Sequence, residues 1–290
     1  MTKRIVFLSM FTLLFAMTHQ NIKAQKMKTK GILLVSFGSS YPEAQAAFQN
    51  IEEETLKSFP DTKIYWAYTS KFIRRKLARN GKYIDSPAQA LARMSEDGIT
   101  HIAVQSLHVI PGSEYHDLQT TVDAFAVIPK GPQKIILGDP LLYNNQDNKE
   151  LAEALKDIFS AQLHKHEALL FMGHGTSHFS NIYYPGFEYY LQKQMPQAYM
   201  GTVEGYPELG DVIESLHKEK IKNVILAPFM TVCGDHVQND MVGEEKESWK
   251  SMLEAEGFTV TPSLKGLAEY DNIVSIYIKH LKKSWDELDQ

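Results

Sequence analysis

Three side chains of metal-binding type stand just beyond apolar runs of the chain. They are His174, Glu204 and His236, which follow the runs 169–173, 199–203 and 221–232. Apolar runs of this kind between turn residues are typical of buried parallel strands. Because open α/β sheets bind ligands at the carboxyl ends of their strands, we expect the two histidines to converge. Neutral imidazoles there could hold a divalent metal or act as a catalytic base.

Position alone leaves a simpler alternative open for each candidate. The two histidines could be loop residues with ordinary hydrogen bonds, and Glu204 is by itself more typical of a solvated loop acid or a helix cap. His178 lies four residues after His174, but Gly175 disfavours the helix that would make this a ligand spacing. We therefore expect His178 at a pocket wall or on the surface, and Cys233 as a small buried loop residue.

Several familiar catalytic motifs are missing from the sequence. It has no histidine pair flanking a glutamate with helical spacing, no phosphate-cradling loop and no paired-cysteine zinc motif. The stretch 173–177, Gly-His-Gly-Thr-Ser, does not match the Gly-x-Ser-x-Gly nucleophile elbow, so a histidine-dependent hydrolase lacks a nucleophile. A basic cluster, Arg74 to Lys76, could meet the carboxylates of an anionic ligand or form a solvated helix face.

The composition is that of an ordinary globular protein. The 290 residues are 43% hydrophobic and 22% charged, with a formal net charge of -5, which is enough for one large or two modest cores. No long basic block is present, so nucleic acid binding is not indicated. Because Cys233 is the only cysteine, the chain has no internal disulfide and its core must hold the fold.

The first 24 residues have the pattern of a secretory signal peptide. Lys3 and Arg4 precede the apolar run 5–17, which is too short to span a bilayer comfortably, and a polar segment ends at Ala24. We expect cleavage after Ala24, a periplasmic mature protein and no stable membrane anchor. An uncleaved N-terminal anchor is the alternative.

Strand and helix patterns alternate along the rest of the chain. Strands are predicted at 31–37, 63–68, 99–110, 134–138, 169–174, 199–203, 221–232 and 258–261. Helices are predicted at 44–59, with Ser40 as a candidate cap, and at 72–80, 86–97, 186–195, 210–220, 249–255 and 268–285. This alternation predicts an α/β protein with two similar lobes, each a parallel sheet flanked by helices. The lobes are expected at 25–143 and 144–267, with the metal site in the second and the helix of 268–290 packing on the first.

The two predicted lobes can be aligned with each other. The segment 33–40 matches 170–177, and 99–114 matches 221–236, at similar offsets. An internal duplication explains this match, although βα units also resemble one another without one. In the alignment Phe37 stands where the second lobe has His174, and Glu114 stands where it has His236. Only the second lobe therefore carries imidazoles at these two strand ends.

Several motifs in order resemble the anaerobic-type sirohydrochlorin cobaltochelatases, which are class II chelatases. The motifs are Val-Ser-Phe-Gly-Ser-Ser-Tyr at 35–41, Thr-Ser-Lys-Phe-Ile-Arg-Arg-Lys-Leu at 69–77, Val-Gln-Ser-Leu-His-Val-Ile at 104–110, Phe-Met-Gly-His-Gly at 171–175, Val-Glu-Gly-Tyr-Pro at 203–207 and Gly-Asp-His at 234–236, with Asn-Asp-Met at 239–241. The resemblance covers nearly all of the chain after the signal segment.

The resemblance implies a chelatase-like fold with a cleft between the lobes and ATP-independent insertion of Co²⁺ into sirohydrochlorin, a step towards cobalamin. It also implies that His174, Glu204 and His236 bind the metal. For Glu204, the resemblance alone favours a metal ligand over a loop acid or a helix cap. Because this substrate carries many carboxylates, Arg75 is the predicted anionic contact, assisted by Ser36, Ser39 and the backbone near Gly38.

Export is a departure from the usual cytoplasmic form of the family. Two alternatives to a cobaltochelatase therefore stay open. One is an exported chelatase or dechelatase for Fe²⁺ or Ni²⁺, and the other is a periplasmic haem- or metal-binding protein without turnover. Imidazole ligands suit Co²⁺, Fe²⁺, Ni²⁺ and Zn²⁺ alike. By family analogy a homo-oligomer is expected, and a haem could bind between subunits through His101, His108 or His116.

Overall fold

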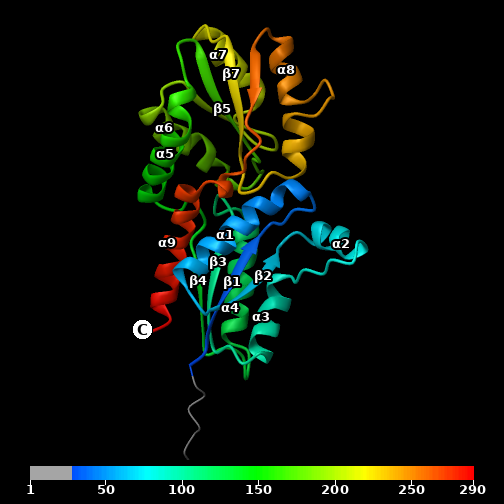
Figure 1. Cartoon of the computed structure of the whole chain (residues 1–290), viewed down its shortest axis with the longest axis vertical. Helices are drawn as coiled ribbons and strands as arrows, with labels where there is room; N and C mark the ends of the chain where they lie inside the picture. The colour runs from blue at the N-terminus through cyan, green and yellow to red at the C-terminus, as the bar shows by residue number, and fades with distance from the viewer. Residues whose placement is uncertain (1–27) are drawn as a thin grey trace, which may run out of the picture.

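The computed structural model describes residues 28–290, so the predicted signal segment lies outside the described residues. Two lobes are stacked along the long axis, each built on a four-stranded parallel sheet (Figure 1). The N-terminal sheet has the order β2-β1-β3-β4, with β1 (Lys30–Ser36), β2 (Lys63–Tyr68), β3 (His101–Ser106) and β4 (Lys134–Gly138). The C-terminal sheet has the order β6-β5-β7-β8, with β5 (Glu167–Gly173), β6 (Ala198–Thr202), β7 (Asn223–Phe229) and β8 (Thr259–Pro262). The two orders are equivalent, as the duplication hypothesis requires.

Helices flank both sheets, as the alternating pattern predicts. Before the chain first crosses to the C-terminal lobe they are α1 (Gln45–Ser58), α2 (Lys71–Arg79), α3 (Pro87–Glu96) and α4 (Ser113–Ala126), and α5 (Asn145–Phe159) follows the crossing and packs against α6. In the second half they are α6 (Tyr183–Gln194), α7 (Leu209–Lys218), α8 (Trp249–Ala255) and α9 (Asp271–Glu287). Short 3₁₀ turns are η1 (Pro42–Ala44), η2 (Ser160–Gln162), η3 (Phe179–Ile182) and η5 (Leu267–Glu269), and η4 (Val237–Met241) is a π-helical turn. No helix within residues 28–290 is both long enough and apolar enough to cross a membrane.

Three sequence expectations need correction. The helices α4 and α5 lie where none is predicted, although Asn144 and Asp147 form a capping box that marks the start of α5. The strand predicted at 99–110 ends at Ser106, because the apolar residues that follow leave the hydrogen-bonded ladder at the lobe boundary. Ser40 caps no helix: the first turn begins after Tyr41, and the Ser40 hydroxyl is buried without a partner in the described structure.

The C-terminal helix α9 returns to the N-terminal lobe. It packs against β3, β4 and α1, and Figure 1 shows it in red beside the lower lobe. At its end, the Lys134 ammonium donates to the Glu287 carbonyl at 2.6 Å, and Lys30 pairs with Asp289 at 2.7 Å. The chain therefore crosses between the lobes twice, once before α5 and once before α9.

A buried ion pair joins α9 to α5. The His280 Nε2 donates to the Asp147 carboxylate at 3.0 Å, and His280 Nδ1 donates to the Asp139 carbonyl at 3.2 Å. Both ring nitrogens of His280 therefore face oxygen atoms, and the side chains of His280 and Asp147 are only 4% and 1% exposed. Burial alone would raise the pKa of Asp147, but the hydrogen bond and charge of His280 outweigh it and hold that pKa below its usual range.

Candidate metal centre

The structure brings together the three residues singled out as metal ligands. One ligand atom from each of His174, Glu204 and His236 lies within 4.8 Å of the others. Glu204 stands between the two rings, with its carboxylate oxygens 3.9 Å from His174 Nδ1 and 4.0 Å from His236 Nε2. The two imidazole rings are perpendicular, with centroids 4.5 Å apart. Two nitrogen donors and one oxygen donor at this spacing suit a first-row divalent cation.

The loops after β5 and β6 fix this spacing through their backbones. The Val203 amide donates to the Gly173 carbonyl at 3.0 Å, and the Glu204 amide donates to the His174 carbonyl at 2.8 Å. Gly175 has a φ of +77°, and a Cβ there would lie 2.5 Å from the Gly205 nitrogen. Only glycine allows the two loops to approach this closely, so the glycine after His174 sets the position of Glu204.

Each ligand histidine is oriented through its Nδ1 atom. The His174 Nδ1 donates to the Gly175 carbonyl at 2.8 Å, and the His236 Nδ1 donates to the Asp240 carboxylate at 2.6 Å. An oxygen acceptor beside Nδ1 favours the tautomer in which Nδ1 carries the proton. In that tautomer Nε2 has a free lone pair that can bind a metal. The π-helical turn η4 brings Asp240 into reach, four residues after His236.

We expect Asp240→Ala to weaken Co²⁺ binding by about 10- to 100-fold, the usual effect of removing a carboxylate that orients a ligand histidine. Titration of the purified protein with Co²⁺, followed by calorimetry, measures this change. Asp240→Asn keeps an oxygen acceptor for His236 Nδ1 and should recover much of the affinity. Equal affinities for wild type and Asp240→Ala would contradict this role.

The loop after β1 forms the opposing wall in the N-terminal lobe. Ser36 and Ser39 are both 2% exposed, and their hydroxyls accept from the amides of Gly38 and Tyr41, each at 3.2 Å. Gly38 has a φ of +98° and lies against the Tyr68 ring. These bonds give the three predicted residues a role in shaping the loop. Contact of Ser36, Gly38 or Ser39 with a substrate stays a prediction.

A hydrogen bond between the lobes lies beside the metal centre. The Tyr41 hydroxyl donates to the Asp235 carboxylate at 2.5 Å, and this bond raises the pKa of Tyr41. The Asn239 amide group also reaches the Tyr41 hydroxyl, at 3.4 Å. Asp235 directly precedes His236, so the contact fixes the ligand-bearing loop against the N-terminal lobe.

The predicted anionic contact, Arg75, is exposed on α2, while its neighbour Arg74 is half-buried. The Nε atom of Arg74 is shielded from solvent and has no hydrogen-bond partner within residues 28–290. The basic cluster thus contains one arginine directed partly into the protein. Contact of Arg75 with a substrate carboxylate stays a prediction.

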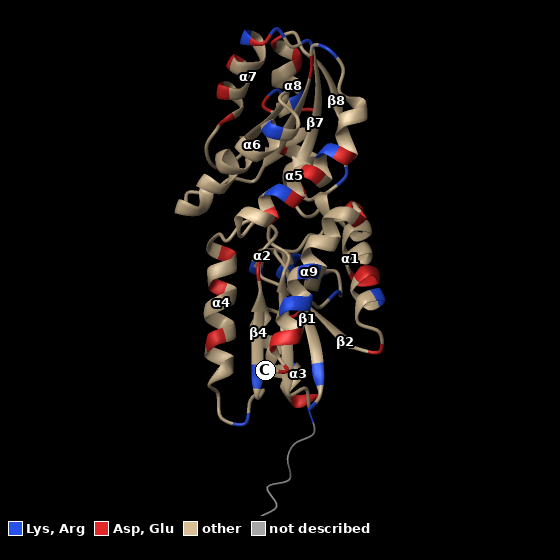
Figure 2. Ribbon diagram, turned by 90° about the vertical axis from the view of Figure 1, so that its left-hand side faces the viewer, with Lys and Arg blue, Asp and Glu red and all other residues tan. Residues whose placement is uncertain are grey.

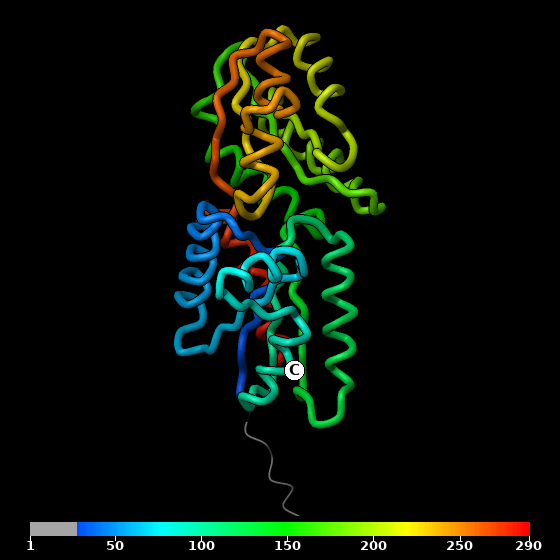
Figure 3. Tube along the Cα trace, turned by 90° about the vertical axis from the view of Figure 1, so that its right-hand side faces the viewer, coloured from blue at the N-terminus to red at the C-terminus, as the bar shows by residue number. Residues whose placement is uncertain are grey.

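The other candidate histidines within residues 28–290 lie outside this centre. His178 Nδ1 accepts from the Ser180 amide at 3.2 Å and so caps η3, which places its proton on Nε2 and makes it a poor metal ligand. Its ring lies 5.2 Å from that of His116, across the lobe boundary near the projecting segment of η3 in Figure 3. His101 begins β3 at the end of the sheet away from the centre.

Of two further candidates, Cys233 is buried and His108 is half-buried. The Cys233 thiol donates to the Leu264 carbonyl at 2.9 Å, and burial raises its pKa to about 12, as suits the structural role expected of it. His108 interacts with the Ser106 hydroxyl through Nδ1, at 2.9 Å, and its Nε2 is shielded from solvent without a partner in the described chain. Burial lowers the pKa of His108 to about 4, so this imidazole is neutral at physiological pH.

We expect the wild type to lose stability as the pH falls from about 6.5 towards 4, partly because His108 gains its proton only on unfolding. Its unfolded-state pKa is about 6.5, so the loss is at most about 1.4 kcal/mol per pH unit. Denaturant unfolding at pH 7.5 and pH 5 measures it. The variant His108→Gln should lose less on acidification, whereas the surface variant His217→Gln should match the wild type. A His108→Gln variant with an undiminished loss would refute the assignment.

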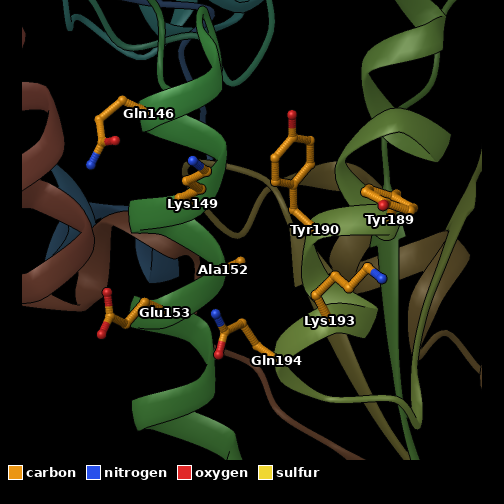
Figure 4. Close-up of a pocket in the computed structure, with 8 residues that line it drawn as sticks. All are labelled: Gln146, Lys149, Ala152, Glu153, Tyr189, Tyr190, Lys193 and Gln194. Carbon is orange, nitrogen blue, oxygen red and sulfur yellow. The ribbon is translucent and has the colours of Figure 1, made fainter.

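A surface groove of about 480 Å³ lies between α5 and α6 (Figure 4). Its lining is mostly polar, with one alanine: Gln146, Lys149, Ala152, Glu153, Tyr189, Tyr190, Lys193 and Gln194. None of the predicted site residues lines it. The groove is therefore separate from the chemistry inferred above.

The fold and the centre together define a class of protein. Two α/β lobes face each other, and one of them presents a His-Glu-His set of ligands at the carboxyl ends of its strands. A donor set of this kind suits a protein that binds a divalent metal ion. The cobalt chelatase (CbiK) family matches residues 30–286, and the chain belongs to that family.

Characterised relatives cover nearly the whole chain. A sirohydrochlorin cobaltochelatase, CbiKC, from Nitratidesulfovibrio vulgaris is 38% identical over 263 residues, covering 91% of this chain and 93% of the relative. The sirohydrochlorin cobaltochelatase of Salmonella typhimurium is 37% identical over 257 residues, covering 88% and 96%. Among solved structures, SirB from Bacillus subtilis with Fe³⁺ aligns with a TM-score of 0.60 at 16% identity, covering 90% of this chain and 98% of SirB. This last match supports the chelatase-like fold alone.

Proposed function

We propose that this protein inserts Co²⁺ into sirohydrochlorin without ATP. The observation that carries the proposal is the convergence of His174, Glu204 and His236 in a member of the cobalt chelatase family. Both closely related enzymes are sirohydrochlorin cobaltochelatases. In this proposal the tetrapyrrole binds at the lobe boundary, with its ring facing the three ligands.

The two histidines have the clearest part in the reaction. Insertion replaces two pyrrole protons by one divalent ion, so the site must hold the ion and remove protons. The Nε2 lone pairs of His174 and His236 bind Co²⁺ while it loses water ligands. Glu204 can bind through one carboxylate oxygen and accept a pyrrole proton at the other, since its side chain is 57% exposed. Release of the ion to the ring nitrogens then completes the exchange.

The reaction can be followed directly. Purified protein is mixed with Co²⁺ and sirohydrochlorin in the absence of ATP, and the absorbance change of metallation is recorded. We expect a rate above that of the uncatalysed mixture, and the same rate when ATP is added. A rate equal to the uncatalysed one would reject the proposal.

We further propose that the protein works in the periplasm, on the strength of the leader pattern in residues 1–24. Mass spectrometry of the exported protein should find Gln25 at its N-terminus, and an intact leader would contradict this. Because cobalamin synthesis is cytoplasmic, an exported form favours a second candidate function: metal exchange on a scavenged tetrapyrrole with Fe²⁺ or Ni²⁺. Metallation rates with Co²⁺, Fe²⁺, Ni²⁺ and Zn²⁺ distinguish the two.

Haem binding and self-association are further properties that we propose for the second candidate function. His116 lies beside the lobe boundary, whereas the Nε2 atom of His108 is shielded from solvent, so His116 is better placed than His108 as an axial ligand. An absorption spectrum with and without haem, recorded for wild type and His116→Ala, tests this. Sedimentation of the same samples gives the oligomeric state. Co-purified haem without metallation activity would favour a binding protein.

A further inference from the structure

The turn η3 extends from a fixed helix towards the metal centre. Its outer side chains pack little, since Phe179 is 77% exposed and Ile182 is 66% exposed. The helix α6 that follows is anchored, because Tyr184 is 3% exposed and a Cβ at Gly173 would lie 2.6 Å from its ring. The stretch 175–187 contains no acidic residue, lysine or arginine, and Figure 2 shows it as a tan segment at the lobe boundary. What it offers to the neighbouring ligand loops is therefore hydrogen bonding rather than a permanent charge.

The side chain of Asn181, within η3, bridges the two loops that carry His174 and Glu204. Its Oδ1 atom accepts from the Thr176 amide at 3.1 Å, and its Nδ2 atom donates to the Tyr206 carbonyl at 2.7 Å. Each of these backbone groups lies two residues after the ligand of its own loop. A carboxamide carries an acceptor and a donor side by side, so one residue satisfies an amide of one loop and a carbonyl of the other.

The loop that carries Glu204 depends on such bonds for its position. None of the residues 203–206 is buried: the Glu204 side chain is 57% exposed and Tyr206 is 62% exposed. The base of the loop is closed by the Thr202 amide, which donates to the Pro207 carbonyl at 2.7 Å. Because packing does not hold the part between, the carboxamide bond to the Tyr206 carbonyl restrains the half of the loop that follows the ligand.

The approach of Asn181 leaves no room for a side chain at position 205. A Cβ on Gly205 would lie 2.1 Å from Asn181 Oδ1 and 2.9 Å from the Thr176 nitrogen. Gly205 is not among the glycines with a positive φ, so its backbone conformation is open to other residues. Contact with the carboxamide and with the Thr176 backbone is therefore what requires glycine here, next to the ligand Glu204.

We propose that Asn181 is a positioning residue, which holds the Glu204 carboxylate between the two ligand histidines. This role rests on the proposed function and couples two of the three ligand loops through one side chain. The carboxylate oxygens lie 3.9 and 4.0 Å from His174 Nδ1 and His236 Nε2. Residues of a working site must be held within about 0.5 Å of their productive positions. An exposed carboxylate on a free loop does not meet this limit, and binding the ion would then have to order the loop as well.

Binding of Co²⁺ alone measures this role without turnover. Calorimetric titration of purified Asn181→Leu, which removes both hydrogen bonds at similar volume, should give a Kd about 10- to 100-fold above that of the wild type, the range for residues that orient a ligand. Its metal-free melting temperature should stay close to that of the wild type, since the broken bonds lie at partly exposed loop tips. Gln197→Leu is the matched control, because this half-buried carboxamide donates to the His164 carbonyl at the opposite edge of the sheet. It should bind Co²⁺ as the wild type does.

A double-mutant cycle separates positioning from a general loss of structure. In a Glu204→Gln background, Asn181→Leu should raise the Kd by no more than about twofold, because the carboxylate that it positions is already lost. In an Asp240→Ala background it should keep its full effect, because Asp240 orients His236. A purely structural role would give the same loss in every background.

Gly205→Ala gives a second measurement of the same contact. It leaves Asn181 in the chain but displaces its carboxamide, so it should raise the Kd for Co²⁺ in the same way, and it replaces Asn181→Leu if that variant folds poorly. Wild-type Kd values in both folded variants, or an undiminished effect in the Glu204→Gln background, would overturn this role and leave the proposed function intact. A wild type that shows the whole pattern but does not metallate sirohydrochlorin would reject the proposed function alone. A wild type that fails to bind Co²⁺ would overturn both.

Discussion

Replacing His174 or His236 with alanine should lower the rate of Co²⁺ insertion by at least about 100-fold. Loss of a residue that merely orients a ligand costs up to about 100-fold, and each of these histidines would supply a ligand atom itself. The two rings lie 4.5 Å apart around the same Glu204, so one histidine cannot replace the other. Stopped-flow absorbance with saturating sirohydrochlorin measures the rate.

The double variant separates a shared site from two independent ones. If both histidines hold the same ion, His174→Ala and His236→Ala together should be little worse than either alone. His217→Ala removes an exposed histidine that pairs with Glu256, and it should retain the full rate. Wild-type rates in either single variant would remove that histidine from the site.

The second large effect concerns stability. Asp147→Ala should reduce the free energy of unfolding by about 3–5 kcal/mol, because it removes the carboxylate of a buried pair and leaves the His280 side chain without its partner. The same change removes the capping box at the start of α5. For a protein of this size the melting temperature should fall by about 10 °C, which calorimetry measures. Because the pKa of Asp147 is lowered in the folded state, its contribution is present above about pH 4 and disappears as the pH falls further.

Lys279 provides the matched control for this pair. Its ammonium also contacts Asp147, at 3.4 Å, but its side chain is 46% exposed. An exposed pair contributes up to about 1 kcal/mol, so Lys279→Gln should lower stability only slightly. If Asp147→Ala and Lys279→Gln were equally stable, the buried pair would not hold α9 in place.

The fold was largely predictable because two periodicities alternate along the chain. Continuous apolar runs such as 31–37 and 169–174 are typical of strands that are buried on both faces of a sheet. In the structure these two runs form β1 and β5. The helix α4 was missed because its first residue follows Gly112, which offers no side-chain cap. Its burial comes from contacts with α3 and β4, which a local pattern does not contain.

The candidate site was predictable to the level of strand ends. Parallel strands share one carboxyl edge, so His174 and His236 could be placed together without a structure. Glu204 needed the family resemblance, because a loop acid carries no local mark of its role. The bonds from His236 to Asp240 and from Tyr41 to Asp235 depend on a π-helical turn and on the docking of the lobes. The sequence alone contains the spacing of four residues between His236 and Asp240, but not the turn that brings the two side chains together.

The return of α9 also affects the order in which the molecule can be assembled during synthesis. The N-terminal sheet is complete once β4 has left the ribosome, but one of its faces stays uncovered until the last helix emerges. All strands of the C-terminal lobe are translated before that point. The lobe made first is therefore the lobe finished last, so a nascent chain exposes apolar surface on β3 and β4 until translation ends.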